Sequence, residues 1–235
     1  MDETKFAAGQ VVTGFSFPVV ALYQNNGGAV SYTNGMDLAR GVSVDPDIET
    51  TGDDNDFNAN NRASESAPKR FRRGTLGLTV DGVLRAAEQL IMGIPDADIS
   101  TVTVGESEVE FTDYGDAQKI PYVGVGVIVR SMSNGVELFR PWVYPKVRFA
   151  QFVVPAATEE DDIDWQTTDL EATILRDDTA KHNWQRVGQP LATELEAYNA
   201  IRAVLGMSLA SELPINGPVP NVPAEDPAED TEAGA

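Results

Sequence analysis

The sequence predicts a mainly β protein of the α+β class, built on an antiparallel β-sandwich or barrel. Several segments alternate apolar and polar residues with a period of two, and turns rich in Asn and Gly separate them. Only two segments have the period of an α-helix, one flanking the sheet and one near the C-terminus. The 235 residues fit one domain, 1–207, followed by an acidic, proline-rich tail, 208–235, that we expect to be disordered.

The N-terminal part predicts a β-hairpin followed by another extended segment. Pro18–Gln24 has the composition of a strand, Asn25–Gly28 supplies residues that accept the positive φ of a tight turn, and Ala29–Tyr32 follows as the antiparallel partner. A further extended segment covers Leu38–Val44. Regular apolar spacing then ends, so we expect a long polar loop over residues 45–73.

The middle of the chain predicts a strand, a short helix and two more strands. Thr75–Val80 alternates with Leu76, Leu78 and Val80 on one face. The period then becomes helical: Asp81 is a candidate N-cap, and Gly93 with Pro95 gives a stop signal. This amphipathic helix should pack against the sheet. Thr101–Val104 and Glu108–Thr112 are the next two predicted strands.

A long hairpin is predicted from Tyr122 to Tyr144, with its turn at Asn134-Gly135. In its first arm the valines between 123 and 129 share one face, while Gly124 and Gly126 share the other and leave room for a close neighbour. The strand behind the acidic connector, Trp165–Ile174, alternates so that half of its surface should be exposed to water.

A second helix is predicted over Thr193–Gly206, because Thr193 and Glu196 form a capping box and the apolar residues that follow line one face. The sequence leaves open whether this helix closes the domain or docks on a neighbouring chain.

Net charge and composition argue against several classes of function. The chain carries a formal charge of −20 with a pI near 4.2, which argues against a protein that grips DNA or an anionic membrane. It has no cysteine, so disulfides and thiolate metal sites are excluded. The N-terminus is acidic and lacks the basic residues and apolar stretch of a secretory signal. No apolar run approaches the roughly 18 residues of a membrane helix. We expect a product made in the cytoplasm that does not cross a membrane.

The candidate catalytic groups are few. His182 is the only histidine, and we expect it to be structural or exposed to solvent. Asp161, Asp162 and Asp164 beside Trp165 could supply the two carboxylates of a glycosidase, but a run of acids in a connector is usually solvated surface. We therefore expect no enzyme, no catalytic residue and no cofactor.

A partial calcium-loop pattern is interpreted as chance spacing. Asp54, Asp56 and Asn58, with Glu65 behind them, match ligand positions of such a loop. Ala59 stands where the loop needs glycine, and a nearby arginine brings a positive charge. We expect no metal site.

The segment 45–73 divides by charge. Its first half is acidic and its second half is basic; the residues are Asp45, Asp47, Glu49, Asp53, Asp54 and Asp56, then Arg62, Lys69, Arg70, Arg72 and Arg73. The basic run around Phe71 could contact DNA, but in so acidic a chain we favour pairing with acids of the same segment or of another copy.

The aromatic residues leave two interpretations open. Trp142, Trp165 and Trp184, with Tyr122 and Tyr144, could form a sugar-binding platform, but a sheet core or a subunit interface is the favoured role.

The pair Gly124 and Gly126 lacks the third glycine of a dinucleotide loop.

The order of these parts resembles the major tail tube protein of long-tailed, siphovirus-type bacteriophages. The segments that carry the resemblance span about residues 15–190: Leu38–Glu49, Ala63–Ser66, Arg73–Val80, Pro121–Val129, Asn134-Gly135, Trp142–Phe149, Trp165–Leu170 and Leu175–Asp178. The C-terminal helix and the acidic tail depart from the pattern.

The resemblance implies a structural virion protein, made in the cytoplasm of a host bacterium, that stacks as homohexameric rings into the tail tube. DNA would pass through the acidic channel without specific binding, and a tape measure protein and a tail terminator would be further partners. The long loop would contact the next ring; the residues implied are Asp53, Asp54, Asp56, Lys69, Arg70, Arg72 and Arg73. The alternatives are a head–tail connector or tail terminator ring and, more remotely, a carbohydrate-binding β-sandwich.

Overall fold

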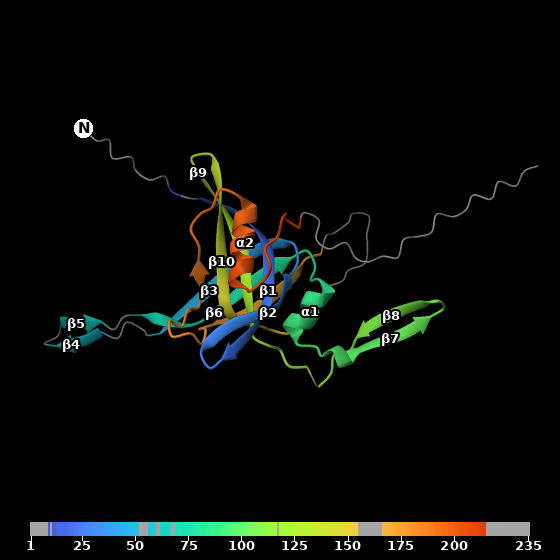
Figure 1. The fold of residues 1–235 in the computed structure, drawn as a ribbon. Helices are drawn as coiled ribbons and strands as arrows, with labels where there is room; N and C mark the ends of the chain where they lie inside the picture. Colours follow the sequence, from blue (N-terminus) through green and yellow to red (C-terminus); the bar gives the residue numbers. More distant parts are fainter. Residues whose placement is uncertain are drawn as a thin grey trace, which may run out of the picture.

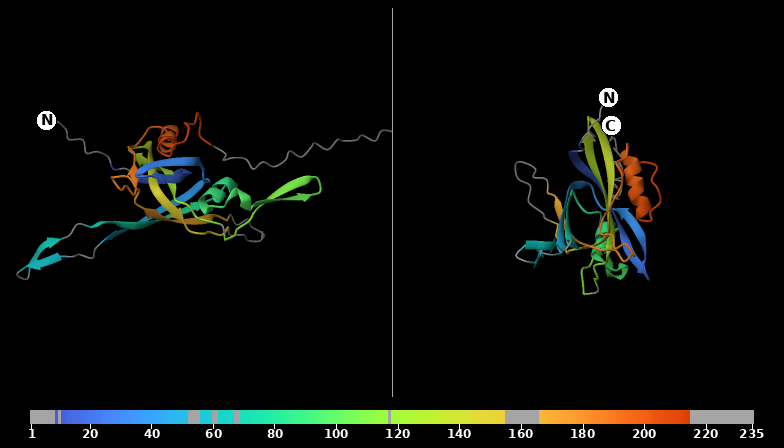
Figure 2. Two further views of the ribbon diagram at one scale, coloured as in Figure 1. Left: turned by 60° about the horizontal axis from the view of Figure 1, so that its bottom comes forward. Right: turned by 90° about the vertical axis from the view of Figure 1, so that its left-hand side faces the viewer.

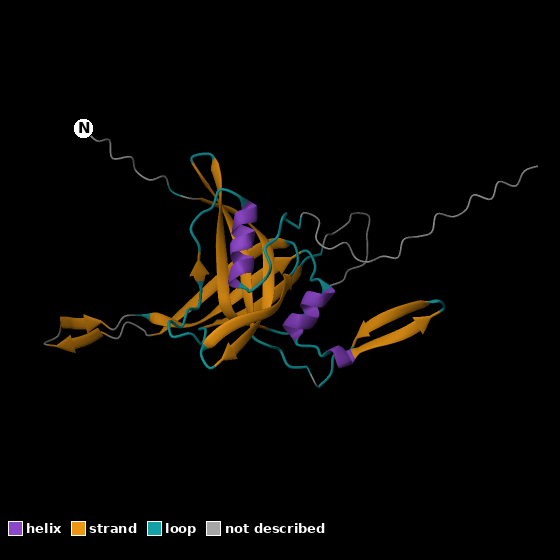
Figure 3. Cartoon of the chain, viewed as in Figure 1, coloured by secondary structure: helices purple, strands orange, loops and turns teal. Residues whose placement is uncertain are grey.

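The computed structural model describes residues 9, 11–51, 56–59, 62–66, 69–116, 118–154 and 166–214, with the backbone alone for 56–59 and 62–66. One antiparallel sheet dominates it, in the order β2-β1-β9-β10-β11-β6-β3, with β12 also paired to β10 (Figures 1 and 3). Its strands are β1 (Val11–Asn26), β2 (Ala29–Asp37), β3 (Gly41–Thr51), β6 (Arg70–Val80), β9 (Val123–Ser133), β10 (Val136–Phe149), β11 (Thr168–Leu175) and β12 (Arg186–Val187). The predicted mainly β, antiparallel class is confirmed.

Two short hairpins stand apart from this sheet in the pairing: β4 (Asp56–Ala59) with β5 (Arg62–Ser66), and β7 (Ile99–Val104) with β8 (Ser107–Thr112). The helices are α1 (Arg85–Met92), the short 3₁₀-helix η1 (Asp96–Asp98) and α2 (Glu194–Val204). In Figure 1 the two hairpins project from opposite sides of the central sheet, and the left view of Figure 2 agrees.

The sheet bends at β10 and folds over a core. Most of β10 pairs with β9, but Lys146–Phe149 pairs with β11, so this strand joins the two layers. The valines that the sequence placed on one face of the long hairpin pack in this core, together with the inward residues of β6 and β11. Leu76, Leu78 and Val80 are buried there as predicted. In β11, buried and exposed residues alternate, which confirms its predicted half-wet surface.

The hairpin turns follow the expected turn chemistry. Gly27 and Gly28 have φ of 68° and 92° between β1 and β2, and Asn134 and Gly135 have φ of 50° and 78° between β9 and β10. Glycine and asparagine tolerate these left-handed conformations, which match the twist of the flanking strands. The turn residues therefore set the antiparallel pairing of both hairpins.

Helix α1 lies where it was predicted, but its N-cap is different. Leu84 is the N-cap and makes no side-chain capping bond, while Gly93 ends the helix with φ of 64°. Asp81 instead accepts a hydrogen bond from the backbone N–H of Arg40, 3.0 Å away, and pairs with the guanidinium of the same residue. The predicted capping role of Asp81 is wrong because this carboxylate joins the β2–β3 connection to the end of β6.

Helix α2 begins at its predicted cap, where Thr193 Oγ1 accepts from the backbone N–H of Glu196 at 3.3 Å. The helix packs on the outer side of β1, β9 and β10 and builds a second apolar cluster there. Both glycines have α2 as a close neighbour. An added Cβ at Gly126 would lie 2.1 Å from Ile201 Cγ2, and one at Gly124 would lie 2.5 Å from Tyr32 Cε1 of β2 and 2.7 Å from Leu205 Cδ2 at the helix end. Helix α2 thus closes its own domain.

The segment predicted as the loop 45–73 differs most from expectation. Strand β3 continues to Thr51 and β6 starts at Arg70, paired from Asp45↔Gly77 to Thr51↔Arg70, and the β4–β5 hairpin lies between them. The prediction missed the period of two because acids occupy the successive outward positions Asp45, Asp47 and Glu49 of β3. At the other predicted boundaries, β3 starts at Gly41 rather than Leu38, and of the tail only 208–214 falls within the described residues.

Candidate assembly surfaces

The outer face of β3, β6 and β11 is exposed, polar and acidic. Strand register aligns residues from the three strands in rows, such as Asp45, Gly77 and Glu171. The exposed acids are Asp45, Asp47, Glu49, Asp169 and Glu171, and the exposed cations on the same face are Arg73 and, at its margin, Arg148. We call this surface the acidic face. Within the described residues neither α-helix covers it, whereas α2 covers the opposite layer (Figure 2).

The acidic face is shallow and hollowed at its centre. Gly77 lacks a side chain between two acidic neighbours, which leaves a depression of about 680 Å³. A hydrogen bond from Thr79 Oγ1 to Asp169 Oδ1, 2.8 Å long, ties β6 to β11 on this side. No apolar side chain points outward from these rows, so the face has no exposed apolar patch that an apolar partner could bury. It is suited to contact with water and ions.

One salt bridge on this surface joins two residues of the same chain, Arg73 and Glu49. Arg73 Nε donates to Glu49 Oε2 at 2.8 Å and Arg73 Nη2 donates to Glu49 Oε1 at 3.0 Å, across the β3–β6 pair. These bonds hold the pKa of Glu49 below its ordinary value. The pair is solvent-exposed and joins an acidic to a basic residue of the segment 45–73, so the predicted pairing within the chain occurs at this position.

The structure describes only some of the other residues that were predicted to contact the next ring. Asp53 and Asp54 lie outside the described residues, and Asp56 starts β4, for which the backbone alone is described. Lys69, Arg70 and Arg72 are at the start of β6, and their side chains lie away from the core. The structure thus brings the basic residues to the root of the β4–β5 hairpin and leaves their contact with another copy untested.

A second surface, absent from the sequence prediction, is the projecting hairpin of β7 and β8. Every residue from Ser100 to Phe111 is exposed. Its root is held by a salt bridge of 3.1 Å between Arg85 and Glu110 and by a backbone bond of 2.8 Å from Asp113 N–H to Asp98 O. The two strands were predicted, but their separation from the main sheet could not be seen in the sequence.

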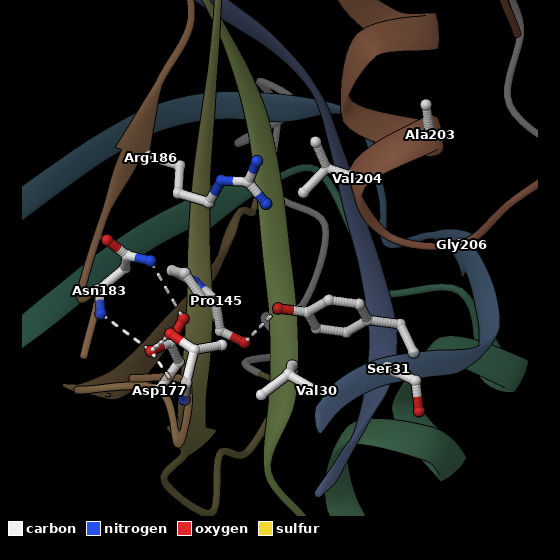
Figure 4. Close-up of a pocket in the computed structure, with 11 residues that line it drawn as sticks. Val30, Ser31, Pro145, Asp177, Asn183, Arg186, Ala203, Val204 and Gly206 are labelled. Atoms are coloured by element: carbon white, nitrogen blue, oxygen red, sulfur yellow. Dashed lines mark hydrogen bonds between the residues drawn. The ribbon is translucent and has the colours of Figure 1, made fainter. Parts of the chain in front are cut away.

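The third candidate is a hollow of about 350 Å³ between β2, the end of α2 and the loop before β12 (Figure 4). Its polar groups bond within the chain. Buried Asp177 accepts from Thr179 Oγ1 at 2.7 Å and from Asn183 N–H at 2.9 Å, and Tyr32 donates to Pro145 O at 3.0 Å. Burial raises the pKa of Tyr32. The Asp177 bonds hold the loop in its own conformation, and the Tyr32 bond ties β2 to β10, so both have structural roles.

The chemical sites weighed in the sequence do not assemble among the described residues. His182 is exposed in the same loop, with Nδ1 3.2 Å from Asp177 O, as expected for a structural or surface histidine. Asn58 and Glu65 belong to the paired strands β4 and β5 rather than to a calcium loop. Asp161, Asp162, Asp164 and Trp165 lie outside the described residues, within which no metal-binding cluster of acids and histidines occurs.

Three of the aromatic residues, Trp142, Tyr144 and Trp184, pack in or against the core rather than on one platform. Tyr144 is fully buried, and Trp142 and Trp184 are half-buried against the main core. Trp184 stacks on Phe71 with ring centroids 4.9 Å apart. Tyr122 instead lies under the cations of Lys146 and Arg148. This arrangement agrees with the favoured core role and weakens the carbohydrate-binding alternative.

No family model matches the chain, and no curated protein matches it either. Among the described residues, no helix is long and apolar enough to cross a membrane. Indications of function therefore come from the surfaces of the molecule itself.

Proposed function

We propose that this protein is a structural subunit of a bacteriophage tail tube, which assembles as stacked homohexameric rings around a channel for DNA. The observation that carries the proposal is the acidic face: one outer side of the sandwich is closed by α2, while the other is open, polar and rich in carboxylates. A surface of that kind suits the wall of a water-filled channel better than a protein contact.

The charge of this face supports passage of DNA without binding. Phosphates that come within the Debye length of physiological salt, roughly 8 Å, would be repelled by the carboxylates of β3 and β11. Arg73 adds little attraction because Glu49 already pairs with it. The DNA would therefore slide past the wall, in agreement with the role that the sequence resemblance implies.

Open strand edges support assembly. Among the described residues, β2 and β3 end the hydrogen-bonded order of the main sheet, so each has one side without a strand partner in that sheet. Such edges lead to uncontrolled pairing unless they are covered or closed by a partner. In a closed ring the neighbouring subunits would cover them, and the sheets would surround a common channel.

The extended β3–β6 ribbon with its β4–β5 hairpin supports contact between rings. It projects from the sandwich (Figure 1) and has Lys69, Arg70 and Arg72 at its outer end, where the β4–β5 hairpin begins. In this proposal the ribbon reaches the next ring, while a tape measure protein inside the tube and a terminator at its end complete the tail.

The test is the assembly of the purified full chain. We expect light scattering after size exclusion to give a mass of about six subunits or more, and negative-stain images to show rings and long hollow tubes. Single rings that never stack would favour the connector or terminator alternative. A stable monomer at every concentration and salt would overturn the proposal.

A further inference from the structure

Strand β1 has two parts that differ in how they are held. From Val19 onward, β1 pairs with β2 on one side and with β9 on the other. The preceding segment Val11–Ser16, which we call the arm, pairs with β9 alone among the described residues. Val11 and Val12 at its start are 69 and 64% exposed. Little apolar burial holds the start of the arm, so it can open locally at a small cost in free energy.

The joint between the two parts has a strained backbone. Phe17 has φ of 46°, in the left-handed region that a bulky residue rarely adopts. Phe17 also precedes Pro18, and a proline ring favours an extended backbone at the residue before it. Because both effects favour an extended Phe17, a straight strand would release the strain of the present bend.

A straight β1 is incompatible with the position of the arm on its own β9. Along β1 the pairing moves three residues, from Ser16 to Val19. Along β9 it moves only two, from Ile128 to Gly126. The joint thus holds one extra residue, as in a β-bulge, and without it the arm would shift its register and turn its side chains to the opposite faces. When Phe17 becomes extended, the arm therefore has to leave its own β9.

The site that the arm would leave is specific, and it is the same in every copy. Phe15 packs on Gly41 so closely that an added Cβ there would lie 2.1 Å from Phe15 Cε1. Ser16 Oγ donates a hydrogen bond to the carboxylate of Glu194, at the start of α2. Neither these contacts nor the pairing with β9 requires that arm and domain belong to one chain, so the arm of a second copy can make all of them.

We infer that neighbouring copies exchange arms, so that Val11–Ser16 of one copy pairs with β9 of the next. A strained joint and an identical docking site in each copy are the conditions that favour such an exchange. Passed from each copy to the next in one direction, the exchange closes around a ring. This inference rests on the proposed self-assembly, which brings a neighbour within reach, and it adds the segment that links the copies.

Because the chain has no cysteine, an introduced pair can show which chain holds each arm. Val11 and Met132 are directly paired and both exposed, and the Cα atoms of such a pair lie within the range of a disulfide. We would assemble the Val11→Cys/Met132→Cys chain with reductant, oxidise it and separate the products by size without reductant. The expected product is a ladder of linked chains, in which peptide mapping joins position 11 to position 132.

Gln24→Cys with Ser31→Cys is the matched control. These two residues are also exposed and directly paired, but they lie in the β1–β2 hairpin, on the other side of the joint. Their disulfide should stay within one chain, so the yield of linked chains should be several-fold lower.

Two further variants in the same cysteine background test the joint. Phe17→Ala and Phe17→Gly both remove the ring, which lies 5.7 Å from that of Tyr198, but only alanine keeps a Cβ that disfavours positive φ. The ratio of linked to internally bridged chains should be about fivefold to tenfold higher for the alanine variant. Circular dichroism checks that each variant is folded.

The outcomes separate this inference from the proposed function. Rings or tubes in which the disulfide stays within each chain would overturn arm exchange and leave the assembly in place. Equal ratios for the two Phe17 variants would overturn the role of strain at the joint. Linked dimers that never form rings would support the exchange and contradict the tail tube. A chain that remains monomeric under all conditions would overturn both.

Discussion

At the scale of single residues, the packing of α2 on the sheet depends on glycines that face this helix. Gly126 lies under Ile201, and a Cβ there would approach Ile201 Cγ2 to 2.1 Å, well inside van der Waals contact. Strand β9 and helix α2 can therefore lie this close only because one residue has no side chain.

Gly126→Ala is expected to destabilise the fold by about 1 to 3 kcal/mol, because the methyl group has to displace a buried isoleucine. Chemical unfolding would measure the change in free energy. Gly14→Ala is the matched control: it also lies in a strand of the main sheet, and its nearest added contact is Arg130 Cδ at 3.9 Å. Equal stabilities of the two variants would show that the helix does not pack this closely.

A polar residue gives a prediction about pH. Asp178 accepts hydrogen bonds from Lys146 Nζ at 2.7 Å and from the Tyr23 hydroxyl at 2.9 Å. The Lys146 bond, followed by the Tyr23 bond, lowers the pKa of Asp178 from its ordinary value of 3.8. The carboxylate of Asp178 therefore binds a proton less tightly in the folded state than in the unfolded state.

The stabilisation from Asp178 should be complete above its unfolded pKa and should disappear as pH falls through the lower folded pKa. Asp178→Asn is expected to be less stable than the parent chain at neutral pH, and the gap should narrow below about pH 4. Thermal unfolding from pH 7 to pH 2.5 would measure this. A gap that stays constant over the range would contradict the assignment.

At the scale of elements, the ribbon of β3 and β6 is the part whose interpretation changed most. In the sequence, the outward acids of β3 made the spacing of the inward residues Val44, Pro46 and Ile48 hard to recognise. The segment was therefore predicted as a loop although it forms a strand. The ribbon places the basic start of β6 at the base of the β4–β5 hairpin, where another copy could reach it.

In the proposed assembly, reversal of this basic cluster, with Lys69, Arg70, Arg72 and Arg73 all changed to Glu, is expected to shorten the tubes and to lower the temperature at which they dissociate. The reason is that like charges would replace a complementary contact between copies. Electron microscopy and light scattering on heating would measure both effects. Reversal of Lys119, Arg148, Lys181 and Arg186, four other exposed cations, makes the same total charge change elsewhere, so equal effects would show that only net charge matters.

At the scale of the whole molecule, the two sides of the sandwich have different surroundings. Helix α2 occupies one side with a fully buried set that includes Ala197, Tyr198 and Ile201. The other side has five exposed carboxylates drawn from β3 and β11. This difference gives the subunit a direction, which a ring around a channel requires.

If the proposed tube forms, changing Asp45, Asp47, Asp169 and Glu171 to Lys is expected to make it retain DNA, which the parent tube should not bind. The retention should weaken steeply with added salt, because it would come from phosphate neutralisation. Co-sedimentation of tubes with labelled DNA would measure it. The control changes Asp96, Asp113, Asp116 and Glu196, exposed acids away from the acidic face. Retention by both variants alike would show that the acidic face is not the channel wall.

The sequence by itself determined the class, most strands, both helices and the hairpin turns, because the alternation of side chains and the φ of Gly27 or Gly135 are local properties. It also determined the strong negative charge. Only the tertiary structure decided that α2 covers Gly124 and Gly126, that acids near residues 45 and 170 share one face, and that the valines of β7 and β8 remain uncovered. These features depend on strand register and on contacts between distant segments, which no local pattern encodes.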